Sequence, residues 1–147
     1  RPIDTFRNQL TINRGSRHGV TPGAPVVIHS STLIGFITDL YEETSIDQLL
    51  IHPATSLAAE IANETAPRGL LVGRHYTSLA ITTVPQDAKL ESGQKVVSSS
   101  REGLPQGLLI GTIGAVKRQE NEAYQEAAVM LPYDPDSLRA VTILVLP

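Results

Sequence analysis

A hydrolase triad is the first chemistry that the residues of this chain could perform. Its candidate members are a nucleophile, a base and an orienting acid, drawn from Ser98, Ser99, Ser100, His52, His75, Asp39 and Asp47. A triad is defined by geometry, which the order of residues does not reveal. The local sequence gives it little support, because no Gly-x-Ser-x-Gly elbow is present. Arg101, rather than a glycine pair suited to an oxyanion hole, follows the serines.

Metal and cofactor chemistry has even less support. The four histidines, His18, His29, His52 and His75, are far apart and form no His-Glu-x-x-His motif. There is no cysteine, so thiolate sites and disulfides are excluded. The acidic pairs Glu42–Glu43 and Glu120 with Glu122 fall in predicted hairpin turns, where solvated charge is ordinary. The sequence therefore predicts no metal site and no cofactor.

Composition narrows the class of partner. Aromatic residues make up only 4% of the chain and tryptophan is absent, which disfavours sugar clefts and base-stacking platforms. The net charge of −3 predicts no nucleic-acid binding. No apolar run approaches the roughly 18 residues needed to span a bilayer, and no signal peptide is visible. The start at Arg1-Pro2-Ile3-Asp4 is expected of an excised piece of a longer protein.

The elements that would position any site are arranged as a repeat. Pro22-Gly-Ala-Pro-Val-Val27 followed by Leu33-Ile-Gly-Phe-Ile37 returns as Ser92-Gly-Gln-Lys-Val-Val97 followed by Leu109-Ile-Gly-Thr-Ile113. Each copy reads as a tight turn, a short strand, a loop and a second strand with an internal glycine. Matched order and matched glycines predict a duplicated β module.

The whole chain reads as about eleven short strands joined by turns rich in glycine and proline. This pattern predicts an all-β fold of two small packed β-barrels of short antiparallel strands. Residues 1–8 are expected to be a tether, 9–78 the first barrel module and 79–147 the second, with strand exchange between modules left open. One helical turn is predicted around 135–140, capped by Asp134 or Asp136.

Glycines at matched positions are predicted to be structural rather than ligand-binding, because a glycine inside a strand marks a bend, a bulge or a close backbone approach. Pro22-Gly23 is also the signature of a type II turn. The predicted structural set is Gly15, Gly19, Gly23, Gly35, Gly93, Gly107 and Gly111.

Partner contacts are expected from exposed loops and from uncovered strand edges. Leu49–Ile51 and Leu70–Val72 are candidate edge segments. The loop 98–107, with Leu104 expected on its surface, is the favoured recognition segment, and Tyr124 is a further candidate anchor. The predicted partner-binding residues are Tyr41, Leu70, Leu71, Tyr76, Arg101 and Leu104.

These motifs together resemble the extracytoplasmic domain of the rod-shape-determining MreC family. The segment 10–27 is similar to that family's Ile-Asp-Lys-Gly-Ser-x-x-Gly-Val-x-x-Gly-Met-Pro-Val-Val entry, with Ala24 in place of the usual methionine. Arg68–Gly73 resembles its Arg-Gly-Ile-Leu-x-Gly, and 104–111 resembles its Phe-Pro-x-Gly-x-x-Ile-Gly with Leu104 for the phenylalanine. The further matches are Leu33-Ile-Gly35, Gly93 with Val96-Val97, and Glu126 with Ala127 and Val129. Ser100-Arg-Glu102 replaces the family's glycine-rich loop.

The resemblance implies a non-enzymatic scaffold of the bacterial cell-elongation machinery, in the periplasm or on the extracytoplasmic face. The full protein would be anchored in the inner membrane through a missing N-terminal helix and dimerised by a missing coiled coil, of which residues 1–8 would be the end. Implied partners are a class-B penicillin-binding protein, MreD, RodA and the MreB machinery, together with a homo-oligomer or filament. Two other functions stay open at this point, namely a serine peptidase-like double barrel, active or degenerate, and a peptidoglycan-binding module.

Overall fold

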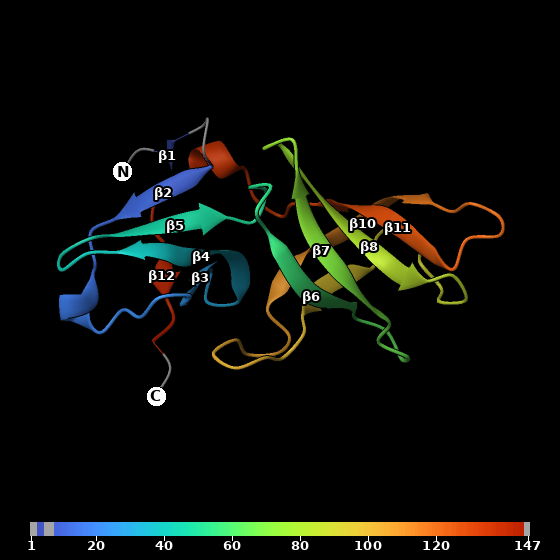
Figure 1. Ribbon diagram of the computed structural model, residues 1–147, viewed down its shortest axis with the longest axis horizontal. Coiled ribbons are helices and arrows are strands. Elements are labelled where there is room, and N and C mark those ends of the chain that lie inside the picture. Colours follow the sequence, from blue (N-terminus) through green and yellow to red (C-terminus); the bar gives the residue numbers. More distant parts are fainter. Residues whose placement is uncertain (1–2, 5–7, 146–147) are drawn as a thin grey trace.

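The computed structural model describes residues 3–4 and 8–145, which form two packed groups of β-strands (Figure 1). The open sheet contains β1 (Ile3–Asp4), β2 (Gln9–Ile12), β3 (Pro25–Ile28), β4 (Thr32–Leu40), β5 (Ser45–Leu49) and β12 (Thr142–Ile143). The closed barrel contains β6 (Ser56–Ile61), β7 (Arg68–Arg74), β8 (Ser78–Pro85), β9 (Lys95–Ser98), β10 (Leu109–Lys117) and β11 (Tyr124–Met130). Two short 3-10 turns are η1 (Ser16–His18) and η2 (Pro135–Ser137). The predicted all-β class is confirmed, and of the two predicted barrels one is closed, while the remaining strands form an open sheet packed against it.

The barrel closes because β10 pairs with both β11 and β9. The strand order runs β10, β11, β8, β7, β6, β9 and returns to β10. Closure removes the free edges that an open sheet leaves exposed. Alternate side chains point inward along each strand, so Leu71, Ile81 and Ile113 are buried to within 1% of full burial. No helix in residues 3–4 and 8–145 is long and apolar enough to cross a membrane.

The open sheet has the strand order β1, β2, β5, β4, β3, β12. It joins the barrel through β4 and β10, which meet in parallel at Thr32 and Leu109. The Leu109 amide donates to the Ser31 carbonyl at 2.8 Å. Packed apolar residues run continuously from the sheet into the barrel, including Leu33, Ile34 and Ile110. The two groups of strands therefore share one core.

The predicted duplication is visible in matched hydrogen bonds. The Gly23 amide donates to the Ile37 carbonyl at 2.8 Å, and the Gly93 amide donates to the Ile113 carbonyl at 2.8 Å. Gly23 has φ +78° and Gly93 has φ +94°, which a residue without Cβ adopts at no steric cost. The same strand pair, β3–β4 or β9–β10, follows each of these turns.

The other predicted structural glycines fit their assignment. Gly35 and Gly111 occupy the same place in β4 and β10, each beside a break in strand register. A Cβ on Gly35 would collide with the Gln48 carbonyl, and one on Gly111 with the Met130 carbonyl. Close approach of a neighbouring strand explains both. The remaining three are Gly15, which touches the backbone of 41–42, and the positive-φ residues Gly19 and Gly107.

The strand pairing divides the chain differently from the expected boundary between residues 78 and 79. β6 and β7, expected in the first module, pair with β9 and β8 in the closed barrel. β12, expected in the second module, pairs with β3 in the open sheet. Exchange of strands between the modules accounts for both differences. Within the expected tether over 1–8, Ile3–Asp4 form β1, while residues 1–2 and 5–7 lie outside the described residues.

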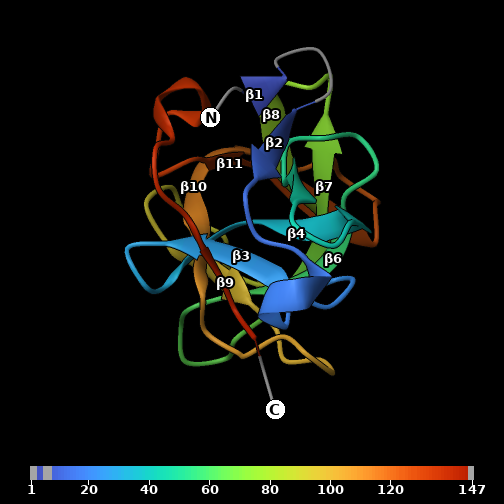
Figure 2. The ribbon, with the colours of Figure 1, turned by 90° about the vertical axis from the view of Figure 1, so that its left-hand side faces the viewer.

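The chain returns from the barrel to the open sheet along residues 131–141. This segment contains the predicted helical turn, and the Asp134 side chain accepts a hydrogen bond from the Asp136 amide, as expected of a cap. Tyr133 and Leu138 pack against the core on the way. Figure 2 shows this red segment continuing into β12 across β3.

Candidate interaction surface

Two of the three serine candidates for a nucleophile are buried, and the third, Ser100, is exposed. Ser98 is fully buried and Ser99 is only 3% exposed. The Ser98 hydroxyl donates to the Pro105 carbonyl at 2.8 Å and accepts from the Leu108 amide at 3.0 Å. These bonds fasten the loop 98–107 to the barrel. Ser98 is thus a structural residue that holds this loop.

The histidine and aspartate candidates are not joined into a triad. His52 Nδ1 accepts from the Ala54 amide at 3.0 Å, a local turn contact. Asp47 is fully buried, and neither of its carboxyl oxygens has a hydrogen-bond partner among the described residues. Burial raises the pKa of Asp47 well above its ordinary value, which favours the neutral acid. Within residues 3–4 and 8–145, no three His, Cys, Asp or Glu residues are placed to hold a metal ion.

The prediction that Leu71 and Leu104 bind a partner from the surface is wrong, because both are buried. Leu104, expected on the surface of the loop, is only 3% exposed, and Leu71 is fully buried. Leu104 turns inward because its amide and carbonyl both bond to Arg101, which closes a tight turn over the core. Leu71 points into the barrel because it alternates with Leu70 along β7. The segment 49–51 is also core, at 4% exposure or less.

Three further candidates are exposed but stand apart from one another. Tyr41 is 59% exposed in the turn between β4 and β5. Tyr76 is 45% exposed in the turn between β7 and β8, with its ring edge-on to His52 at 5.4 Å. The Arg101 guanidinium lies 4.9 Å from the centre of the Phe36 ring, so it links the barrel loop to β4 of the open sheet.

Leu70 belongs to a continuous apolar area on the outside of the barrel, here called the barrel face. Strand register places Val72 beside Ala80, and Ala80 beside Ala128. Leu70 lies opposite Thr82, and Met130 lies opposite Thr112 of β10. Leu70 and Met130 are 36% and 58% exposed. The barrel face comprises Leu70, Val72, Ala80, Thr82, Ala128 and Met130.

An ion pair crosses the barrel face. Arg74 Nη1 lies 2.8 Å from Glu126 Oε2, and the pair joins β7 to β11 over the intervening strand β8. The hydrogen bond from Arg74 lowers the pKa of Glu126, so the carboxylate stays charged near neutral pH. Ala80 of β8, the strand between the two charged residues, is only 5% exposed. The face is therefore apolar with one fixed pair of charges.

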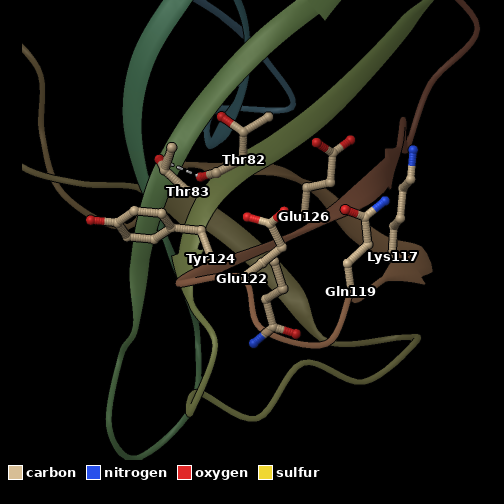
Figure 3. A pocket seen from close by; sticks show the side chains of 8 residues that line it. Thr82, Thr83, Lys117, Gln119, Glu122, Tyr124 and Glu126 are labelled. Carbon is tan, nitrogen blue, oxygen red and sulfur yellow. Dashed lines mark hydrogen bonds between the residues drawn. The ribbon is translucent and has the colours of Figure 1, made fainter.

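A polar hollow of about 320 Å³ adjoins the barrel face, shares Thr82 with it and is also lined by Glu126 of the ion pair. In Figure 3, Tyr124 lies beside Thr83, and Gln119 and Lys117 lie on the other side of the hollow. Tyr124 is 57% exposed. Together the face and the hollow offer apolar area, a phenol and charges of both signs, which is the composition of a protein–protein contact.

The sequence pattern pointed to Leu70 within the candidate edge segment 70–72, and to Tyr124 as a separate candidate anchor. It did not point to Ala80, Ala128 or Met130. A signal was present, because Tyr124, Glu126, Ala128 and Met130 alternate along β11 and must share one side of the strand. Which side faces water depends on strands far away in sequence.

Comparison with known proteins gives the same family as the motifs. The profile of the family described as "Rod shape-determining protein MreC, barrel core" matches residues 1–145. The cell shape-determining protein MreC of Listeria monocytogenes is 30% identical over 144 residues, which cover 95% of this chain and 48% of that protein. MreC of Haemophilus influenzae is 28% identical over 123 residues, which cover 82% of this chain and 34% of that protein. The chain thus spans about half of one relative and about a third of the other.

Solved structures agree in fold. The structure of Listeria monocytogenes MreC has a TM-score of 0.86 at 28% identity, covering 97% of this chain and 70% of that one. Pseudomonas aeruginosa MreC has a TM-score of 0.81 at 23% identity, covering 96% and 91%. A complex of penicillin-binding protein PBP2 with MreC from Helicobacter pylori matches with a TM-score of 0.73 at 17% identity, covering 95% of this chain and 87% of that one. The fold, the repeated motifs and the profile match over residues 1–145 show that this chain belongs to the MreC family of rod shape-determining proteins.

Proposed function

We propose that this chain is a non-enzymatic scaffold domain of the cell-elongation machinery, and that its barrel face binds a class-B penicillin-binding protein. The observation that carries the proposal is the apolar barrel face, with Met130 and Leu70 exposed on a rigid closed barrel. MreC of Helicobacter pylori, which has the same fold, is known in complex with the penicillin-binding protein PBP2. Ser98 and His52 make structural hydrogen bonds, and Asp47 is buried without a partner among the described residues, so these three do not form the triad of the peptidase alternative.

The size of the barrel face sets a limit on the contact. Strands β7 and β11 have seven residues each; at ~3.4 Å per residue and ~4.8 Å per strand, three strands give about 24 by 14 Å, or roughly 340 Å². A stable interface buries about 800 Å² on each partner. Surface beside the face must therefore join the contact for binding to be stable, and the adjoining polar hollow, with Tyr124 and Lys117, would supply part of it.

The scaffold acts by holding one conformation of its partner. A bound protein shifts a conformational equilibrium only by the difference between its affinities for the two states. A rigid barrel face suits this task, because little conformational entropy is lost when it binds. The penicillin-binding protein would be retained in the conformation whose surface matches the barrel face.

Further partners and the location are part of the same proposal. MreD, RodA and the MreB machinery would assemble around the full protein, which would self-associate into an oligomer or filament. The domain would work in the periplasm, on the outer side of the inner membrane, tethered by an N-terminal anchor of the full protein. Family membership supports each of these assignments.

Calorimetric titration of the chain with the extracytoplasmic domain of the cognate penicillin-binding protein tests the proposal. We expect Leu70→Asp and Met130→Asp to weaken binding by about tenfold or more each, because both would place a charge in an apolar contact. Tyr41→Asp is the matched control, since Tyr41 is 59% exposed and Met130 is 58% exposed. Equal binding by all three variants would refute the barrel face as the site.

A further inference from the structure

The open sheet has an apolar groove with a basic rim at its unclosed side, here called the edge groove. It has a volume of about 560 Å³ and lies between the end of β2 and the segment that carries β12. Figure 2 shows this red segment running past β2 and η1. The edge groove is lined by Ile12, Asn13, Arg14, His18, Val20 and residues 139–143 together with Val145. It lies on the open sheet, whereas the barrel face lies on β7, β8 and β11.

One wall of the edge groove is a free strand edge. β12 pairs only with β3 among the described strands. The Leu144 amide donates to the Pro25 carbonyl at 2.9 Å, so residues 142 and 144 direct their backbone groups toward β3. Because this direction alternates along an antiparallel strand, Ile143 and Val145 direct theirs away from β3. Such an edge is a template for one more strand.

The other walls define what that strand must contain. Ile12, Val20 and Ile143 give an apolar floor, and Val145 is 54% exposed beside Gly19. The charged and titratable residues of the lining are Arg14, Arg139 and His18, and no acidic residue is among them. Neither arginine forms an ion pair with any residue in the described part of the chain. A basic rim in a chain of net charge −3 selects for carboxylates.

We propose that the edge groove binds an extended acidic segment of a partner protein, which adds to β12 as a further strand. Backbone hydrogen bonds to Ile143 and Val145 would supply affinity, as in other cases of strand addition. Alternate apolar side chains would enter the groove, and the carboxylates of the intervening residues would meet Arg14 and Arg139. The site is independent of the barrel face, so failure of either proposal leaves the other standing.

The probe is a fluorescein-labelled peptide of sequence Glu-Val-Glu-Val-Glu-Val-Glu, titrated with the chain and followed by fluorescence anisotropy. Two control peptides replace every glutamate by lysine or the central valine by proline. We expect the acidic peptide to bind, the lysine peptide to bind at least about tenfold more weakly, and the proline peptide to lose most of its affinity. Equal binding of the three peptides, or no binding of the acidic one at about 1 mM, would overturn the proposal.

Variants separate the rim from the strand edge. The double variant Arg14→Glu with Arg139→Glu should weaken peptide binding by about tenfold or more, while Lys95→Glu, on the barrel, should change it by less than about twofold. Val145→Pro removes an outward amide, whereas Val145→Thr keeps it, so only the proline should abolish binding. Equal binding by the two Val145 variants would overturn strand addition.

Two measurements on the unchanged chain complete the test. Hydrogen exchange at the amides of Ile143 and Val145 should slow by about tenfold or more in saturating peptide. Sedimentation of the chain without peptide tests whether two copies associate through the edge groove. We expect the chain and the arginine double variant to sediment alike. An association that the double variant abolishes would assign the edge groove to a second copy of this chain and overturn the proposal of a partner segment.

Discussion

Replacing Asp47 by asparagine should stabilise the protein, and the gain should grow as the pH rises from 4 toward neutrality. The carboxyl is fully buried in the open sheet, both oxygens lack partners among the described residues, and burial raises its pKa well above the ordinary value. The negative charge of Asp47 also helps to raise the pKa of the buried Tyr133 hydroxyl, after burial itself. Ionised Asp47 is therefore costly in the folded chain and costs little in the unfolded one.

The sign and the size follow from proton linkage. Below the ordinary aspartate pKa of about 3.9, Asp47 is protonated in both the folded and the unfolded chain, and its ionisation does not lower the free energy of unfolding. Between that value and the raised pKa, the unfolded chain has lost the proton and the folded chain keeps it. Stability then falls by up to about 1.4 kcal/mol for each pH unit, and it levels off above the raised pKa. Asparagine has nearly the same shape and no such slope.

Urea unfolding of both proteins at about pH 4.5, 5.5, 6.5 and 7.5 measures the effect. The free energy of unfolding of Asp47→Asn minus that of the parent should increase with pH by up to about 1.4 kcal/mol per unit. Asp39→Asn is the control, because Asp39 is an exposed carboxyl on the neighbouring strand β4. A difference for Asp47→Asn that stays constant with pH would refute the reasoning, since it would mean that Asp47 is solvated in the folded chain.

Three further changes test the packing of the fold. Valine at Gly35 or Gly111 should destabilise the protein by about 2–4 kcal/mol in urea unfolding, because its Cβ would strike a carbonyl of the next strand; a loss below about 0.5 kcal/mol at both would contradict the close approach. Leu104→Asp should lower the free energy of unfolding by about 3 kcal/mol or more, because Leu104 is buried. An unchanged melting temperature would contradict this burial and mean that Leu104 is exposed on the loop. Glu126→Gln should cost less than about 1 kcal/mol at pH 7, because both partners of the Arg74 pair are partly exposed. That cost should vanish as the pH falls through the lowered pKa of Glu126, and a cost that persists at low pH would exclude the ion pair as its cause.

Local sequence patterns predicted those features of the fold that are made by neighbouring residues. The turn at Gly23 and its copy at Gly93 depend on a conformation that the local residues favour, and both appear with the same hydrogen bond. The cap at Asp134 is likewise a contact over two residues. The glycines in β4 and β10 were recognisable because duplication placed them at matched positions.

Features made by distant residues escaped sequence reasoning. β6 and β7 have the same apolar pattern as strands of the open sheet, so only their pairing with β9 and β8 assigns them to the barrel. Leu104 stands in a loop with no apolar period, and its burial follows from the hydrogen bonds of Ser98 and Arg101. The barrel face needs three strands in register before its residues become neighbours.

The most direct test of the central claim uses Met130, the one methionine of the chain, which is 58% exposed on the barrel face. Labelling the methionine methyl group with carbon-13 gives a single NMR signal that reports on this surface alone. Titration with the extracytoplasmic domain of the cognate penicillin-binding protein should shift or broaden that signal, and Leu70→Asp should restore it to its free position. Binding that calorimetry detects while the Met130 signal stays unchanged would contradict the account and place the partner elsewhere on the molecule.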